Sequence, residues 1–353
     1  MSFADPLAGV PSVESPFFND IFRETETSHE FMRIARSLHE KGYAVIDFPD
    51  PLFSERAAAI IEALTPRLAT GNDSPPVFQA GSRIENAWNI SEHVKALASN
   101  ETIMALLAKL YGRRAWPFQT LNFPMGSQQH FHTDAIHFSS VPERFMCGVW
   151  VALEDIGPQQ GPLEFYPGTH KWPVYGNEHI GRKGVHHKLS TQGDFHELWE
   201  ALVARAGIAR ETFCPRKGQT LIWAANLLHG GAAQHDPART RWSQVTHYYF
   251  EDCAYYTPMK SDPFRGLISF REPVNIVTGE KVPNSYNGEP VPPRFLQEAP
   301  TGFTELIPRE EFDAAAYLEV NQDVAAAGVD AWEHYATYGH KERRYAGKQP
   351  WFE

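Results

Sequence analysis

The chain has few cysteines, no excess of basic charge and no long apolar run, and each shortage excludes a class of protein. Its three cysteines, Cys147, Cys214 and Cys253, form neither a disulfide framework nor a cysteine-based zinc site. A formal net charge of -11 argues against a nonspecific grip on nucleic acid phosphates. No apolar stretch approaches the roughly 18 residues that a membrane-spanning helix needs.

Several short motifs are missing as well. Residues 1–16 hold no basic run followed by an apolar core, so we expect no secretory signal and a cytoplasmic protein. The chain has no G-x-S-x-G, G-x-G-x-x-G or Walker-type loop, which leaves nucleophilic hydrolases, dinucleotide enzymes and P-loop enzymes without support. With 42% hydrophobic and 21% charged residues, the 353-residue chain has an ordinary globular composition and can bury a substantial core.

The hydrophobic pattern divides the chain into a helical first part, a β-rich middle and a helical tail. Helical spacing of apolar residues predicts helices over 28–41, 54–69 and 94–111, with a strand over 43–48. After Gly112 the pattern changes to short apolar and aromatic runs between glycines and prolines, which is typical of a β-sandwich or barrel. The strands expected there are 116–123, 130–138, 145–153, 163–166, 220–223 and 242–250.

Two imidazoles and one carboxylate in the β-rich part form a candidate metal site. His132 and Asp134 are two residues apart, so their side chains share a face if this segment is a strand. An antiparallel barrel can fold His229 back against them. A set of two histidines and one carboxylate leaves coordination positions open, which suits a non-heme Fe(II) that binds cosubstrate and oxygen together. An isolated H-x-D pair is better explained as a structural hydrogen-bonded pair, so the interpretation as a metal site depends on its surroundings.

An arginine follows the three candidate metal ligands in the sequence. Arg241 lies twelve residues after His229, and its planar group can pair bidentately with the carboxylate of a keto-acid cosubstrate. Arg239 would share its strand face and is the alternative. His130 also shares the expected ligand face, where either a substrate-facing or a structural role is open. The adjacent pair at 186–187 would face opposite ways and indicates a solvated loop.

The segment from Met146 to Pro173 carries a family resemblance. Its strand ends in Ala-Leu-Glu-Asp and leads through Gly-Pro-Leu to Pro-Gly-Thr-His. This pattern resembles the phytanoyl-CoA dioxygenase family of Fe(II)/2-oxoglutarate oxygenases, and the similarity extends from about 31–48 to about Pro292. The resemblance implies Fe(II) as cofactor, with 2-oxoglutarate and O2 as cosubstrates.

The same resemblance implies roles for individual residues. His132, Asp134 and His229 correspond to the iron ligands, and Arg241 corresponds to the arginine that binds the distal carboxylate of 2-oxoglutarate. Further candidates to contact 2-oxoglutarate are Gln119, Asn122 and Ser243.

The fold expected on this basis is mainly β with flanking helices. It is a double-stranded β-helix, of the jelly-roll or cupin-like type, plus a small C-terminal helical appendage. The dioxygenase domain is expected over 1–305 and the helical module over 306–353. Within the first domain we expect a helical part over about 20–112, a β-helix core over about 113–255 and an irregular wrap over about 256–305.

The reaction expected is oxygenation of a small molecule, with release of succinate and CO2. The presence of Asp134 favours hydroxylation, oxidative demethylation or desaturation, because halogenating relatives lack this carboxylate. A sugar or a secondary metabolite is a candidate substrate. Two alternatives stay open: a cupin-like metal-binding protein without 2-oxoglutarate turnover, and a non-catalytic interaction protein on an oxygenase scaffold.

The tail carries a second, weaker resemblance. Residues 312–344 are similar to a short helical module appended to bacterial enzymes of surface polysaccharides. Such a small piece has little core of its own, so we expect self-association or docking onto another surface. Its expected aromatic core is Phe312, Tyr317, Trp332, Tyr335 and Tyr338.

Overall fold

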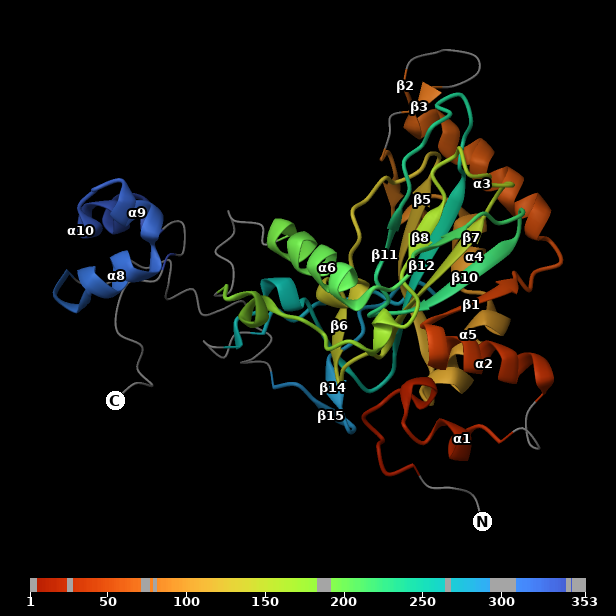
Figure 1. The fold of residues 1–353 in the computed structure, drawn as a ribbon, viewed down its shortest axis with the longest axis horizontal. Helices are drawn as coiled ribbons and strands as arrows, with labels where there is room; N and C mark the ends of the chain where they lie inside the picture. The colour runs from red at the N-terminus through yellow and green to blue at the C-terminus, as the bar shows by residue number, and fades with distance from the viewer. Residues whose placement is uncertain are drawn as a thin grey trace.

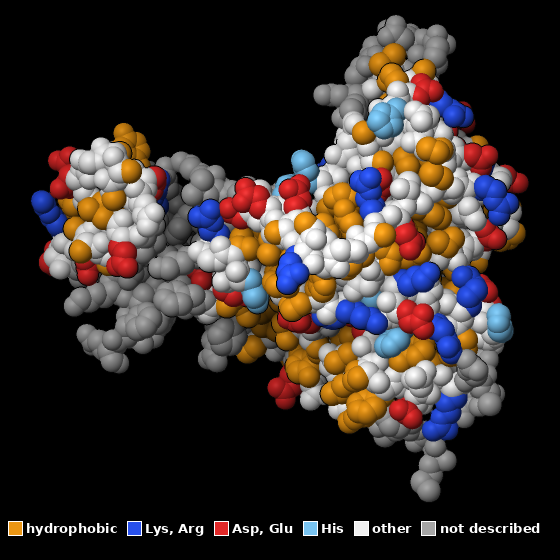
Figure 2. Space-filling view, in the orientation of Figure 1, with side chains coloured by type: hydrophobic (Ala, Val, Ile, Leu, Met, Phe, Trp, Pro, Cys, Tyr) orange, Lys and Arg blue, Asp and Glu red, His pale blue; other side chains and the backbone are white. Residues whose placement is uncertain are grey.

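The computed structural model of the chain describes residues 5–23, 28–70, 77–78, 81–182, 192–263, 268–292, 309–340 and 344. This part is mainly β with flanking helices, as predicted (Figure 1). Within it, no helix has both the length and the apolar character needed to cross a lipid bilayer. On the face shown in Figure 2, acidic and basic side chains are interspersed rather than gathered into one basic surface.

The first two of the predicted helices, α2 and α3 in the structure, form where the sequence predicts them. Helix α2 (His29–Lys41) begins after Ser28, whose hydroxyl accepts the amide hydrogen of Phe31, and ends at Gly42 with a φ of 84°. Helix α3 (Phe53–Leu68) buries one apolar face. Both helices therefore follow from amphipathic spacing, and α2 also from its end signals.

The single helix predicted over 94–111 is wrong in one respect, because the structure has two helices there. Helix α4 (Glu92–Ala98) ends where the hydroxyl of Tyr248 donates to the carbonyl of its last residue. The side chain of Asn100 then accepts an amide hydrogen from the first turn of α5 (Glu101–Tyr111). This cap starts a new helix instead of continuing the old one.

Two antiparallel sheets make up the β-rich part. The larger one contains β1 (Tyr43–Asp47), β10 (Gln219–Ala224), β7 (Met146–Ala152), β12 (Ser243–Phe250), β5 (Ala115–Phe123) and β4 (Ile84–Glu85), in this spatial order. The smaller one contains β11 (His229–Gly231), β8 (Leu163–Phe165) and β9 (Glu211–Phe213). Three two-stranded pairs accompany them: β6 (Ser139–Val141) with β13 (Ala254–Tyr256), β2 (Ala69–Thr70) with β3 (Val77–Phe78), and β14 (Ser285–Tyr286) with β15 (Glu289–Pro290).

The two main sheets pack face to face, and the helices cover the other side of the larger sheet. The ring centroids of Tyr43 on β1 and Phe165 on β8 are 4.5 Å apart, within one cluster of buried side chains from both sheets. Two further clusters join α2, α3, α4 and α5 to the larger sheet. This arrangement is the predicted double-stranded β-helix.

The strand predicted over 130–138 is wrong. Only His132 pairs there, through an isolated bridge to His229, and Asp134–Ile136 forms a 3-10 turn. The reason is local: the carbonyl of Asp134 accepts the amide hydrogens of both His137 and Phe138, which closes a turn where a strand would continue.

The segment after β8 contains α6 (Gln192–Ala206). Phe195 and Trp199 of α6 pack with Ile136 and Leu228, which lie next to the candidate metal ligands in sequence. Helix α6 therefore forms part of the wall around the candidate site. The histidine pair at 186–187 lies outside the described residues.

Within residues 309–340, the described part of the tail, lie three short α-helices, α8 (Ala314–Val320), α9 (Gln322–Ala326) and α10 (Ala331–His334), followed by a π-helical turn over Tyr335–Gly339. Their shared cluster contains Phe312, Tyr317, Val324, Ala331, Trp332 and Tyr335. Tyr338 does not belong to this core, because 59% of it is exposed. The predicted boundary between residues 305 and 306 lies outside the described residues.

We expect Leu107→Ala to destabilise the protein. Leu107 on α5 is fully buried against the larger sheet, and truncating such a leucine costs about 2–5 kcal/mol of unfolding free energy. Urea unfolding followed by tryptophan fluorescence measures the loss. Thr102→Ala on the exposed face of the same helix is the control, and it should change stability by less than about 0.5 kcal/mol. Equal stability of the two variants would contradict the packing described for α5.

Candidate functional site

A cavity of about 450 Å³ collects most of the residues that the sequence singled out. Its walls come from β5, β7, β10, β11 and β12, from α6, and from the loop before His132. It contains His132, Asp134, His229, Arg241 and Gln119. These residues are far apart in sequence, so the fold brings the predicted site together.

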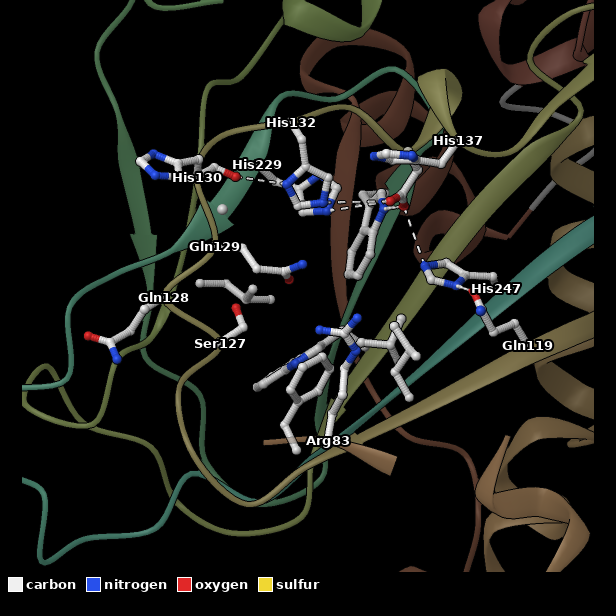
Figure 3. Close-up of a pocket in the computed structure, with 18 of the residues that line it drawn as sticks. Arg83, Gln119, Ser127, Gln128, Gln129, His130, His132, His137, His229 and His247 are labelled. Atoms are coloured by element: carbon white, nitrogen blue, oxygen red, sulfur yellow. Dashed lines mark hydrogen bonds and ion pairs between the residues drawn. The ribbon is translucent and has the colours of Figure 1, made fainter. Parts of the chain in front are cut away.

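The three candidate metal ligands lie close enough to share one ion. The Nε2 atoms of His132 and His229 are each 3.9 Å from Oδ1 of Asp134, and the three candidate ligand atoms lie within 4.8 Å of one another (Figure 3). Two imidazoles and one carboxylate suit a divalent transition metal that keeps open positions. The residues present therefore fit a mononuclear iron site.

Both histidine rings are oriented by the backbone in the same way. Nδ1 of His132 is 2.8 Å from the carbonyl oxygen of His130, and Nδ1 of His229 is 2.9 Å from that of Leu227. A carbonyl only accepts, so Nδ1 carries the hydrogen in each ring. Each Nε2 is then left with its lone pair toward the shared space, as metal ligation requires.

The ionisation states also suit metal binding. Burial lowers the pKa of His132 to about 3, and the neighbouring His229 adds to the effect. Burial by itself would raise the pKa of Asp134, but His229 and His247 hold it below its usual range. At neutral pH the site thus offers a neutral His132 and an ionised Asp134.

The second oxygen of Asp134 faces two side chains from the larger sheet. The indole Nε1 of Trp223 donates to Oδ2 at 2.7 Å, and Nε2 of His247 lies 3.5 Å from the same atom. Nδ1 of His247 is in turn 3.0 Å from Oε1 of Gln119. Only Oδ1 faces both His132 and His229.

Arg241 places a buried positive charge in the same cavity. Its Nη1 donates to Oγ of Ser243 at 3.2 Å, whereas Nε and Nη2 have no hydrogen-bond partner in the described part of the chain. The guanidinium lies over the ring of Trp150, 5.0 Å from its centroid. Burial lowers the pKa of Arg241 to about 10, so the group is still charged at neutral pH. A buried charge with unused donors is a site for an anion.

A polar loop, Ser127 to Gln129, forms another wall of the cavity. It lies against β11 because Gly230 and Gly231 have no side chains: a Cβ on Gly231 would lie 2.6 Å from Oγ of Ser127, and one on Gly230 would lie 2.9 Å from the carbonyl oxygen of Gln129. In Figure 3, Ser127 and Gln129 point toward the centre of the cavity and Gln128 points away. The φ of 50° at Gln128 turns the backbone between them.

The secondary candidates divide according to strand alternation. Ser243 lies beside Arg241, while Gln119 lines the cavity but lies against His247. The interpretation of Asn122 is corrected, because its amide lies on the other face of β5 and donates to Gln244. The side chain of Arg239, the alternative arginine, is exposed.

Several lining residues were missed by the sequence analysis. His247 lies on β12, six residues after Arg241, which precedes the strand, so alternation along this extended segment could have located it. His196 of α6 was also missed. It lies next to His130, the candidate on the ligand face, with ring centroids 4.6 Å apart. Arg83 and Glu85, which form an ion pair beside the cavity, carried no sequence signal.

Comparison with known proteins gives one sequence match and several similar folds. The chain is 28% identical over 131 residues to the peroxisomal phytanoyl-CoA dioxygenase of Homo sapiens, and the match covers 36% of each protein, so it spans about a third of that relative's length. The fold is similar to the epimerase SnoN from nogalamycin biosynthesis, with 20% identity, a TM-score of 0.45, and coverage of 64% of this chain and 85% of that one. It is also similar to EctD from S. alaskensis, solved with 2-oxoglutarate and 5-hydroxyectoine, with 17% identity, a TM-score of 0.48, and coverage of 70% and 84%.

The family model described as Phytanoyl-CoA dioxygenase (PhyH) matches residues 38–241, more than half of the chain. The matched range contains His132, Asp134 and His229 and ends at Arg241. The chain therefore belongs to the phytanoyl-CoA dioxygenase family of iron- and 2-oxoglutarate-dependent oxygenases.

Proposed function

We propose that this protein hydroxylates a small polar molecule in a reaction that consumes O2 and 2-oxoglutarate and releases succinate and CO2. Family membership and the cluster of His132, Asp134 and His229 support this proposal. The observation that carries it is the buried Arg241, which has unused donors in the same cavity as the metal ligands. A metal site alone would not require this charge.

In this proposal His132, Asp134 and His229 hold the iron through Nε2, Oδ1 and Nε2. When bound, the iron supplies the oxygen-activating redox chemistry, and the protein supplies orientation and a protected space. The two backbone carbonyls that fix the histidine rings keep both Nε2 atoms directed to one point. The buried surroundings limit the access of water to that point.

Arg241 and Ser243 would bind the distal carboxylate of 2-oxoglutarate. The guanidinium offers Nε and Nη2, and Nη1 is already held by the Ser243 hydroxyl. Trp150 supports the guanidinium face, so the group is fixed before the ligand arrives. The dicarboxylate would then reach from Arg241 toward the metal ligands in the same cavity.

The substrate would bind against the polar loop. Ser127 and Gln129 point into the cavity (Figure 3), and His130 and His196 stand beside them. Hydroxyl, amide and imidazole groups both donate and accept hydrogen bonds, which suits an uncharged molecule rich in hydroxyl groups, such as a sugar or a secondary metabolite. The helical cluster within 306–353 would serve as a separate docking or self-association module, supported by its own aromatic core.

His132→Ala should abolish tight metal binding while the fold is kept. Removal of a ligand should weaken metal binding by roughly 100-fold or more, because even outer partners of metal ligands typically contribute 10–100-fold. Equilibrium dialysis with Fe(II) under argon, with circular dichroism to verify folding, tests this. Full iron retention by a folded variant would count against the site.

Arg241→Gln should weaken 2-oxoglutarate binding by roughly 100-fold or more, because a buried charge pair is lost. Arg239→Gln is the matched control, since its side chain is exposed two residues away, and it should bind as the wild type does. Calorimetric titration of 2-oxoglutarate into the metal-loaded proteins measures both. Unchanged affinity in Arg241→Gln would favour the cupin-like alternative, a metal protein without 2-oxoglutarate turnover.

Wild-type protein with Fe(II), 2-oxoglutarate and O2 should form succinate slowly, and a substrate should increase the rate and gain one oxygen atom. A screen of sugars, acyl conjugates and secondary metabolites by mass spectrometry identifies it. For the substrate found, Gln129→Leu should raise KM and leave substrate-free succinate formation unchanged. A gain of oxygen confined to charged acyl conjugates would contradict the substrate class proposed.

A further inference from the structure

One row of residues runs across five neighbouring strands of the larger sheet, directly under the candidate metal ligands. The register pairs Tyr43 with Trp223, Trp223 with Gly148, Gly148 with His247, and His247 with Gln119. These residues come from β1, β10, β7, β12 and β5 in spatial order. Directly paired residues in a sheet project their side chains to the same face, so the row presents one surface to the cavity.

Gly148 interrupts this surface between two polar rings. A Cβ at position 148 would overlap the indole of Trp223, so the indole lies over the glycine. His247 stands on the other side of Gly148, and its ring is stacked with Phe118 at a centroid distance of 5.9 Å. The missing side chain leaves room for the Trp223 indole, whose Nε1 donates to Oδ2 of Asp134, and Nε2 of His247 lies 3.5 Å from the same oxygen.

The two oxygens of Asp134 therefore have different surroundings. Oδ2 faces the indole Nε1 at 2.7 Å and the imidazole Nε2 at 3.5 Å, while Oδ1 faces the Nε2 atoms of His132 and His229 at 3.9 Å each. Trp223, His247 and Asp134 are all buried. Gln119 fixes the His247 ring from the opposite side through Nδ1.

We propose that Trp223 and His247 are positioning residues that make Asp134 a one-oxygen ligand, so that the metal keeps the coordination position a chelating carboxylate would fill. This inference rests on the proposed function and adds two residues to its machinery. Neither residue belongs to the set of metal ligands, and neither lies near Arg241 in the hydrogen-bond network described. A carboxylate freed from the indole hydrogen bond and from the His247 ring beside it could rotate and bind through two oxygens.

The experiment uses the full chain with Co(II) as the probe, since the intensity of its visible bands separates five-coordinate from six-coordinate sites. His247→Phe keeps a ring against Phe118 and Phe138 but removes both nitrogens. Trp223→Phe removes the indole donor. Tyr249→Phe is the matched control, because it lies on the same strand, and its buried hydroxyl has no hydrogen-bond partner in the described part of the chain.

We expect both test variants to bind Co(II) 10–100-fold more weakly than the wild type, the range typical for loss of an outer partner of a metal ligand. Their Co(II) spectra should change in intensity, as a second carboxylate oxygen joins the metal. The control should match the wild type in affinity and spectrum. If His247→Phe does not fold, Trp223→Phe decides the question alone.

Wild-type affinity and spectrum in the folded variants would overturn this inference and leave the proposed function standing. A wild-type protein that binds no Co(II) would overturn the proposed function, and this inference would fall with it. A weaker affinity with an unchanged spectrum would also overturn the inference, because it would show that the two residues stabilise the site without setting how Asp134 binds.

Discussion

Two backbone hydrogen bonds between His132 and His229 determine where the rest of the site lies. The amide of each residue donates to the carbonyl of the other, at 2.9 and 3.0 Å. This bridge sets two side chains from distant parts of the chain side by side, with ring centroids 4.5 Å apart. The turn that follows His132 then brings Asp134 into the same space. A loss of the bridge would separate the ligands without altering any of them.

This arrangement buries charged groups, which is energetically unfavourable. Asp134 and Arg241 are both almost fully buried in one cavity, and no ion pair joins them among the described residues. Isolated charges in a low-dielectric interior are unfavourable, so each charge needs a partner of its own. Asp134 has Trp223, His247 and the space between the histidines, whereas Arg241 has one hydroxyl and an aromatic face. A cation beside Asp134 and an anion beside Arg241 would complete both.

Strand alternation explains both the successes and the failures of prediction from the sequence. Arg241 lies two residues before Ser243, the first residue of β12, and their side chains do meet, whereas Gln119 and Asn122 are three apart on β5 and cannot share a face. The side chains of His132 and Asp134 lie close together, as predicted, but an isolated bridge and a turn place them there instead of the predicted strand. Cross-strand register, which places His247 beside Gly148 and Gln119, depends on pairing between distant segments and has no local signal. Asn100, which caps α5, was a sequence signal for the break between α4 and α5. The apolar spacing runs on through this break, and for that reason it predicted a single helix.

The two glycines after His229 also bear on how this enzyme could change its substrate over evolutionary time. They hold the polar loop through its backbone: the amide of Gly231 donates to the carbonyl of Gln129 at 3.1 Å, and the loop's approach requires no particular side chain at 127 or 129. Substitutions at Ser127 and Gln129 would therefore alter what the cavity accepts while the ligand strand stays in place. In the function proposed, the recognition surface and the oxygen-activating centre would be adjacent in space yet separable by mutation, so one scaffold could acquire new substrates without rebuilding its chemistry.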